Sequence, residues 1–316
     1  MDLLKEILRA ESRIRASIKH TPLEYSLPLS GKTGSGVYLK MENLQHTGSF
    51  KARGALSKIL ALPESERRKG VVAASTGNHG AAVAFAAGKV GTRSTVFVPE
   101  GASPAKVEAM KRQGAEVCFH GTDSLESEVH ARAFARQNGK TYVSPYNDIE
   151  VVGGQGTIGI EIARDAPEVD RVFVALGGGG LIAGIACYLK AVNPEVRVVA
   201  CSPENSCVMI QSLKAGRILE LESKPTLSDG TAGGVEAGAI TFDLCRDLVD
   251  ECVLVSEDEI AQAMRTFIES YHMLIEGSAA VAVAAMEKSE QTPRFRSNVV
   301  VLCGGNVSLA TLRKVV

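Results

Sequence analysis

Tryptophan is absent from this chain of 316 residues, and aromatic residues make up only 5% of it. The seven cysteines are odd in number and form no C-x-x-C pair, so a disulfide framework is not expected. The longest run of small apolar residues, Gly277 to Met286, is far short of the ~20 residues that span a bilayer. The chain opens on an amphipathic helical pattern from Asp2 onward, not on a cleavable leader. We therefore expect a reduced, cytoplasmic protein without a membrane partner.

Neither sign of charge is in excess, since the formal net charge is −1. This balance gives no basis for a nucleic-acid partner or an anionic membrane. Hydrophobic residues make up 45% of the chain and charged residues 22%, which is enough to bury a large interior and remain soluble. The length suits two packed α/β lobes better than one small core.

Short apolar, β-rich runs alternate with helical patterns along almost the whole chain. This alternation predicts the α/β class, with open, mostly parallel sheets flanked by helices. Ser103-Pro104 is a typical helix start, with serine as the cap and proline in the first turn. The predicted strands are Val37–Met41, Gly70–Ala74, Ser94–Val98, Glu116–Phe119, Arg171–Leu176, Arg197–Cys201, Cys252–Val255 and Asn298–Leu302. The predicted helices include Ala81–Lys89, Val151–Arg164, Leu181–Val192 and Glu257–Ser270.

In such sheets the ligand binds at the carboxyl ends of the strands, so chemically unusual loops at those ends are candidates for a site. The first is Gly177–Gly180, which follows a predicted strand and precedes a predicted helix. Glycines allow the backbone to approach a ligand closely, and a helix amino terminus offers free N–H groups to an anion such as phosphate. A flexible turn is the alternative, but four consecutive glycines are entropically unfavourable. The segment also fits the dinucleotide pattern G-x-G-x-x-A, although the following strand ends in Ala200-Cys201-Ser202 and not in an acid.

The second loop, Thr47–Arg53, places Lys51 at the start of a helix. A single lysine is usually a solvated surface charge. Here the positive end of the helix and the apolar Phe50 both disfavour the ammonium form, so we expect a lowered pKa. A lysine of lowered pKa is suited to forming a Schiff base with a carbonyl compound.

Two further loops follow predicted strands. Ser75-Thr76-Gly77-Asn78-His79-Gly80 brings hydroxyls, an amide and helix N–H groups together, which suits a carboxylate, although a simple polar helix cap is the alternative. His79 has no second histidine at ligand spacing and is interpreted as a hydrogen-bonded neighbour. The loop Cys303-Gly304-Gly305-Asn306 follows the last strand, and a cysteine there is more often a buried small hydrophobe than a participant.

In this order, the four loops resemble those of the fold-type II pyridoxal-phosphate enzymes, which share a tryptophan synthase β-like fold. The nearest members are the serine/threonine dehydratases and serine racemase. The likeness covers nearly the whole chain. It includes Thr21-Pro22-Leu23, Glu42-Asn43-Leu44-Gln45, Gly154-Gln155-Gly156-Thr157, Ser228-Asp229-Gly230 and Glu276-Gly277-Ser278-Ala279-Ala280. The resemblance implies a large cofactor-binding domain made of residues 1–65 and 148–316, a small domain of residues 66–147, and a homodimer.

The resemblance also implies roles for individual residues. Lys51 matches the lysine that holds pyridoxal 5'-phosphate as a Schiff base and then takes the Cα proton of the substrate. Thr76 lies in the loop where serine racemase has its second base. The implied cofactor-binding residues are Phe50, Lys51, Asn78, Gly177, Gly178, Gly179, Gly180, Leu181, Glu276 and Cys303. The implied substrate-binding residues are Ser75, Thr76, Asn78 and His79.

Cys303 stands where the family places a serine, threonine or cysteine beside the pyridine nitrogen of the cofactor. A thiol there does not hold the nitrogen protonated as a carboxylate would, which favours β-elimination. The cation-activated relatives have acidic ligands in the stretch that corresponds to Ser202–Val208, and here only Glu204 remains. We therefore expect no metal site.

The resemblance predicts a dehydratase that converts a small 3-hydroxy amino acid, such as L-threonine or L-serine, to a 2-keto acid and ammonia. Serine racemisation and the breakdown of 3-hydroxyaspartate or another hydroxy amino acid are alternatives within the family. A nicotinamide-dependent oxidoreductase is the alternative from another class, and it leaves three of the four loops unexplained. A binding protein without catalysis would leave Lys51 without a purpose.

Overall fold

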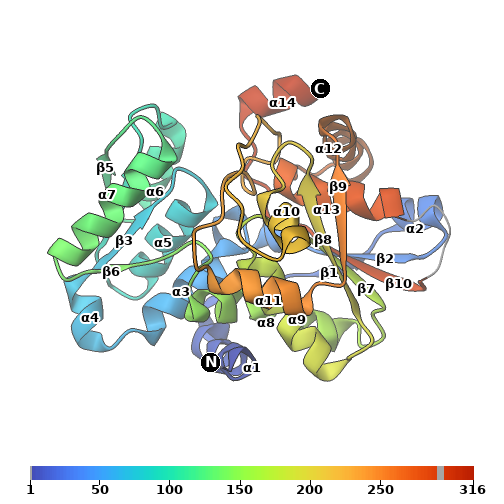
Figure 1. Cartoon of the computed structure of the whole chain (residues 1–316), viewed down its shortest axis with the longest axis horizontal. Helices are drawn as coiled ribbons and strands as arrows, with labels where there is room; N and C mark the ends of the chain where they lie inside the picture. Colours follow the sequence, from blue (N-terminus) through green and yellow to red (C-terminus); the bar gives the residue numbers. More distant parts are fainter. Residues whose placement is uncertain (1, 290–294) are drawn as a thin grey trace.

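The computed structural model describes residues 2–289 and 295–316, which form an α/β structure with two sheets (Figure 1). The larger sheet has the order β1-β2-β10-β7-β8-β9, with β1 antiparallel to β2 and the other neighbours parallel. The smaller sheet, β5-β4-β3-β6, is parallel throughout. The larger sheet consists of β1 (Leu23–Tyr25), β2 (Gly36–Lys40), β7 (Arg171–Ala175), β8 (Arg197–Pro203), β9 (Glu251–Val255) and β10 (Ser297–Val301). The smaller sheet consists of β3 (Val71–Ala74), β4 (Ser94–Val98), β5 (Glu116–Phe119) and β6 (Thr141–Tyr142). The predicted fold class is confirmed.

Helices connect the strands of both sheets. Around the smaller sheet, at the left of Figure 1, lie α4 (Glu64–Lys69), α5 (Asn78–Lys89), α6 (Pro104–Arg112) and α7 (Ser124–Gln137). The rest of the molecule contains α1 (Leu3–Ile14), α2 (Leu27–Thr33), α3 (Lys51–Ala61), α8 (Ile149–Asp165), α9 (Gly180–Val192), α10 (Val208–Ala215) and α11 (Ile240–Leu248). It also contains α12 (Glu257–Tyr271), α13 (Gly277–Ser289), α14 (Leu309–Val315) and the short 3₁₀ turns η1 (Arg15–Ser17), η2 (Glu42–Leu44) and η3 (His46–Gly48).

The main core lies around the larger sheet. The apolar run Gly277–Met286 is the buried part of α13, which packs on β7, β8, β9 and β10. α9 packs on β7 and β8 and is covered in turn by α8, which also contacts α1 and α3. Glycines in α8 make this close packing possible, since a Cβ at Gly154 would lie 2.7 Å from backbone atoms of α3. Among the described residues, no helix combines the length and apolar character that crossing a membrane requires.

All eight predicted strands are present, with ends that shift by at most two residues. The strands β1 and β6 were not predicted, because segments of three and two residues are too short to show an alternating pattern. Ser103 does stand before α6 with Pro104 in the first turn, but its side chain makes no capping hydrogen bond. The seven cysteines are free as expected; however, only Cys201, Cys245 and Cys303 are buried, and Cys252 is exposed.

The strands of the smaller sheet all fall within the range 66–147 that was predicted for a small domain. The exact boundaries remain a prediction. Helix α3 contacts both α5 of this part and α8 of the other. The parallel strands β2, β10 and β7 have their carboxyl ends at one edge of the larger sheet. The carboxyl end of β3 in the smaller sheet lies beside the same cavity as the ends of β7 and β10. The fold thus places the four unusual loops around one cavity between the two sheets.

Candidate active site

A cavity of about 1480 Å³ lies between the two sheets and is lined by residues from all four loops. Every residue that the sequence analysis placed at the site lines this cavity. These are Phe50, Lys51, Ser75, Thr76, Asn78, His79, Gly177, Gly178, Gly179, Gly180, Leu181, Glu276 and Cys303. The fold therefore assembles the predicted set at one place, although Phe50 and Cys303 are 253 positions apart in the chain.

Lys51 is the first residue of α3 and points into the cavity, where its Nζ donates a hydrogen bond to the Pro145 carbonyl at 2.8 Å. The amine lies 5.1 Å from the centre of the Phe50 ring. Burial lowers the pKa of Lys51 to about 8, against smaller upward effects of Cys303 and Glu276. Near physiological pH the amine is therefore neutral far more often than that of an ordinary lysine, and the neutral form is the one that reacts with a carbonyl group.

The glycine loop leaves β7 and enters α9, with Gly179 in the left-handed region at φ 86°. Side chains would not fit here. A Cβ on Gly178 would lie 2.4 Å from the Tyr146 ring, and one on Gly177 would lie 2.9 Å from the backbone of Thr231. No side chain caps the amino terminus of α9, so its first N–H groups are available to a ligand. The geometry is that of an anion cradle.

The loop Ser75–His79 leads from β3 into α5, whose amino terminus also lacks a side-chain cap. Ser75 Oγ accepts a hydrogen bond from the Gly77 N–H at 3.1 Å, which holds the turn. His79 is buried, and its Nε2 lies 2.8 Å from the Val143 carbonyl, so this nitrogen carries the proton. Burial, together with the nearby Lys51, lowers the pKa of His79 to about 3. The ring is neutral and orients the loop, and the free N–H groups of α5 can receive a carboxylate.

Glu276 lies next to α13 and is only 4% exposed. The Asn78 amide donates to both of its carboxylate oxygens, at 2.9 and 3.0 Å, and the Asn306 N–H donates to one of them at 3.1 Å. Asn306 in turn donates to Asn78 Oδ1 at 2.8 Å. Burial raises the pKa of Glu276 to about 7, although the bond from Asn78 acts in the opposite direction. These three residues connect the start of α5 to two loops at the larger sheet.

Cys303 follows β10 and is 2% exposed. Its carbonyl accepts a hydrogen bond from the Phe50 N–H at 3.0 Å, which ties the lysine loop to the last strand. Burial and the nearby Glu276 raise the pKa of the Cys303 thiol well above its usual value. The thiol is therefore neutral and can donate or accept one weak hydrogen bond.

Sequence reasoning missed Tyr146, which packs against the glycine loop. Its hydroxyl accepts a hydrogen bond from the Glu236 N–H at 3.0 Å, and Glu236 pairs with Arg132 of α7 at 2.8 Å. Tyr146, Glu236 and Arg132 all line the cavity. Nothing in the local sequence marks them, because each sits in a loop or helix surface with no distinctive motif. Among the described residues, no group of three histidine, cysteine or acidic side chains could hold a metal ion.

Comparison with known proteins gives a consistent result. Residues 14–304 match the model of a protein family described as pyridoxal-phosphate dependent enzyme. An L-threonine ammonia-lyase of Thermotoga maritima is 42% identical over 316 residues, which is 100% of this chain and 78% of that protein. Among solved structures, maize serine racemase superposes with a TM-score of 0.93 at 33% identity, covering 98% of this chain and 95% of that one. A processed threonine deaminase isoform of Solanum lycopersicum gives a TM-score of 0.94 at 32% identity, covering 99% and 87%.

Proposed function

The chain belongs to the family of pyridoxal-phosphate dependent enzymes, and we propose that it is an ammonia-lyase of L-threonine, L-serine or a related 3-hydroxy amino acid. The net reaction converts the amino acid to a 2-keto acid and ammonia. The observation that carries this proposal is the convergence, in one cavity, of an amine of lowered pKa, a glycine cradle and an uncapped helix start. The L-threonine ammonia-lyase that is 42% identical over the full chain supports the choice of reaction. The G-x-G-x-x-A match is explained as part of this cradle, without a nicotinamide cofactor.

The residues of the cavity fit pyridoxal phosphate. We assign its phosphate to the N–H groups of Gly177–Gly180 and Leu181, because the room that side chains would fill is left open there. Lys51 would hold the cofactor through its aldehyde carbon, and Phe50, Asn78, Glu276 and Cys303 would line the space for its ring. A neutral thiol at Cys303 leaves the ring nitrogen without a carboxylate partner, which is the arrangement that favours elimination.

When bound, pyridoxal phosphate withdraws electrons from the substrate Cα and thereby weakens the bond to its proton. Lys51 then has two tasks, which are to hold the cofactor and to receive the Cα proton at Nζ. Its pKa of about 8 suits both, since the amine gains or loses a proton close to neutral pH. The Pro145 carbonyl orients the amine.

The substrate carboxylate is assigned to Ser75, Thr76, Asn78 and His79 at the start of α5. Because His79 is neutral, it contributes position and not charge, and the partial positive charge of the helix end attracts the carboxylate. Thr76 lines the same cavity, and its hydroxyl makes no hydrogen bond within the described part of the chain. A low racemase activity is the second function that we propose, with Thr76 as the group that protonates the opposite face of Cα. The likeness to maize serine racemase supports it.

Lys51→Ala tests the assignment. We expect the purified variant to lose the visible absorption of bound cofactor and its reduction by borohydride, since Lys51 is the lysine whose pKa burial lowers to about 8 beside Cys303. In the variant, keto-acid formation from serine, threonine and 3-hydroxyaspartate should fall below detection. In the native enzyme, the same assay ranks the three substrates. Retained absorption together with full turnover would show that another lysine holds the cofactor.

We also propose that the protein is a homodimer that works in the cytoplasm. The free cysteines fit a reducing compartment. Light scattering coupled to gel filtration measures the dimer directly, and a monomeric mass at micromolar concentration would contradict it.

A further inference from the structure

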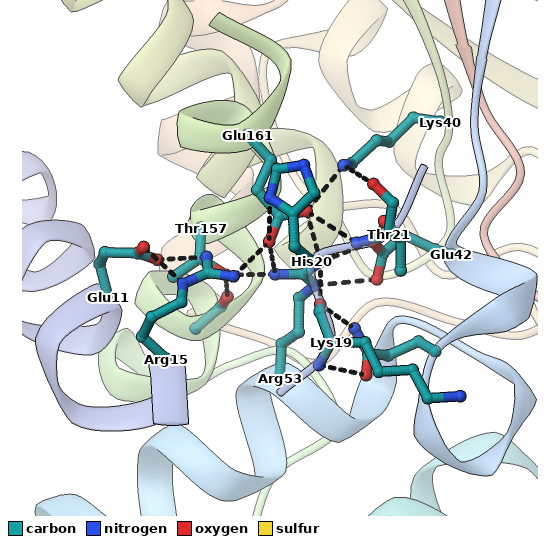
Figure 2. A network of polar contacts seen from close by, with 12 residues as sticks. Glu11, Arg15, Lys19, His20, Thr21, Lys40, Glu42, Arg53, Thr157 and Glu161 are labelled. Atoms are coloured by element: carbon teal, nitrogen blue, oxygen red, sulfur yellow. Dashed lines mark hydrogen bonds and ion pairs between the residues drawn. The ribbon is translucent and has the colours of Figure 1, made fainter. Parts of the chain in front are cut away.

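A network of buried charges lies behind the first turn of α3 (Figure 2). Its centre consists of two cations and two anions whose side chains are fully buried: Lys40, Glu42, Arg53 and Glu161. They come from the end of β2, from η2, from α3 and from α8. The four charges sum to zero, and each is paired with a charge of opposite sign, as is usual for buried ions. The network is not part of the cavity.

Arg53 is the residue that joins these elements. Its guanidinium makes two bonds to Glu42, from Nε at 2.9 Å and from Nη2 at 2.8 Å. It makes two more to Glu161, at 2.8 Å each, and one to Thr157 Oγ1 at 3.1 Å. These contacts and a longer one to the Lys19 carbonyl use the whole donor fork of the guanidinium. A lysine has three donors on one atom and cannot reproduce this pattern.

Lys40 and Thr21 provide further hydrogen-bond donors to the two glutamates. Lys40 Nζ contacts Glu161 Oε2 at 2.7 Å and donates to the Thr21 carbonyl at 2.6 Å, and the Thr21 hydroxyl donates to Glu42 at 2.6 Å. Burial alone would raise the pKa of Glu161, but the Arg53 and Lys40 cations lower it to about 2. Glu161 is therefore ionised at any physiological pH. Burial lowers the pKa of Lys40 below its ordinary value, and the nearby Glu161 acts in the opposite direction.

Arg53 lies two residues after Lys51 in the same helical turn. Two residues correspond to about 200° of rotation in an α-helix, so the two side chains leave α3 on nearly opposite sides. Lys51 lines the cavity, whereas Arg53 does not. The Arg53 side chain points instead into the network (Figure 2). The Arg53 N–H also donates to the Phe50 carbonyl at 3.0 Å, and Phe50 itself is tied to Cys303. The turn that carries Lys51 is thus held from both sides.

We propose that Arg53 is a positioning residue for Lys51: its pairing with Glu42 and Glu161 fixes the first turn of α3 and keeps the Lys51 amine inside the cavity. This inference rests on the proposed role of Lys51 as the cofactor lysine. A small displacement of the first turn of α3 would move the Lys51 amine toward water. The pKa of Lys51, which burial holds at about 8, would then rise toward its ordinary value of 10.5.

The test measures the pKa of Lys51 in the full-length protein freed of cofactor. Trace labelling with acetic anhydride at a series of pH values, followed by peptide mass spectrometry, gives the fraction of neutral amine at this one residue. We expect a midpoint at about 8 for the native chain. In Arg53→Lys the midpoint should move up by about one unit, so that labelling of Lys51 at neutral pH falls about tenfold. Recapture of pyridoxal phosphate should slow by a similar factor.

Arg15→Gln is the matched control. Arg15 contacts the same Glu161 oxygen at 2.8 Å, but it follows α1 and its side chain is 31% exposed. Its loss removes one partner from Glu161 and leaves the turn of α3 in place. We expect the labelling midpoint of Lys51 to stay unchanged in this variant, even if the melting temperature falls.

Glu42→Gln carries the test if Arg53→Lys does not fold. Glutamine preserves the shape of the side chain, removes its charge and replaces one of the two oxygens that accept from Arg53 with a donor group. It should move the Lys51 midpoint in the same direction. A folded Arg53→Lys or Glu42→Gln protein with an unchanged midpoint would overturn the proposal and leave the network a purely structural role. The labelling does not depend on cofactor binding, so failure of the Lys51→Ala experiment would be a separate result.

Discussion

The pKa values of the ionisable side chains in the cavity are shifted in directions that suit different tasks. Burial lowers the pKa of Lys51 to about 8 and that of His79 to about 3, and it raises that of Glu276 to about 7. Lys51 and Glu276 can therefore each gain or lose a proton near neutral pH. His79 stays neutral and holds its loop in place through its hydrogen bond to Val143. The position of Lys51 at the start of a helix, next to the apolar Phe50, indicated its lowered pKa from the sequence. The shift of Glu276 depends on burial, which a motif does not reveal.

Cys303 offers a test at the scale of one residue. Because its thiol is neutral and buried, Cys303→Ser keeps a neutral group with one hydrogen-bond donor, and we expect keto-acid formation to stay within about threefold of the native rate. Cys303→Asp places a desolvated acid beside Glu276 and should weaken cofactor binding by more than tenfold. Equilibrium dialysis against pyridoxal phosphate and a keto-acid assay measure both effects. Equal cofactor affinity in the two variants would mean that Cys303 does not face the ring.

The elements that form the site share one construction, in which a buried strand ends in a small-residue loop that opens a helix. This holds for β3 with α5 and for β7 with α9. Both loops could be predicted, because an apolar strand, a glycine-rich turn and a helical pattern are local features of the sequence. Tyr146, which closes one side of the cradle, could not be predicted, since its contact with Gly178 joins residues 32 positions apart without a local motif.

At the scale of the glycine loop, we expect Gly178→Ala to reduce the affinity for pyridoxal phosphate by more than tenfold. The added Cβ would lie 2.4 Å from the Tyr146 ring and force the loop out of position. Tyr146→Ala in the same chain should restore part of the affinity by making room. Gly31→Ala is the control, since a Cβ there meets nothing within 4 Å. Titration of the cofactor-free proteins measures the affinities, and an unaffected Gly178→Ala protein would place the phosphate elsewhere.

For the molecule as a whole, the two-sheet α/β architecture followed from the alternation of strands and helices, and the comparisons confirm the family. The contacts that join the two parts could not be read from the sequence. Asn78 and Glu276 are 198 positions apart, and Arg53 and Glu161 are 108 apart. Such polar pairs form wherever packing leaves complementary groups facing each other, and a single sequence carries no periodic signal for them. The buried network behind α3 is the clearest case.

The pKa of Glu276 makes the stability of the folded protein depend on pH. Its pKa is raised from 4.5 in the unfolded chain to about 7 in the folded protein. The folded state therefore binds this proton more tightly, so the stabilisation is complete below about pH 4.5 and is lost as the pH rises through about 7. The difference of about 2.5 units corresponds to a loss on the order of 3 kcal/mol of unfolding free energy.

Glu276→Gln should remove this part of the pH dependence, because glutamine stays uncharged. Urea unfolding of the cofactor-free protein at about pH 5 and about pH 8 gives the change in unfolding free energy for each chain. We expect the native protein to lose more stability between the two values than the variant does, by on the order of 3 kcal/mol. Glu108→Gln is the control, since its side chain is 59% exposed and no similar effect is expected. An identical pH dependence in the native and Glu276→Gln proteins would show that Glu276 is ionised in the folded state well below neutral pH. Asn78 and Asn306 would then donate their hydrogen bonds to a carboxylate that joins the two parts of the molecule.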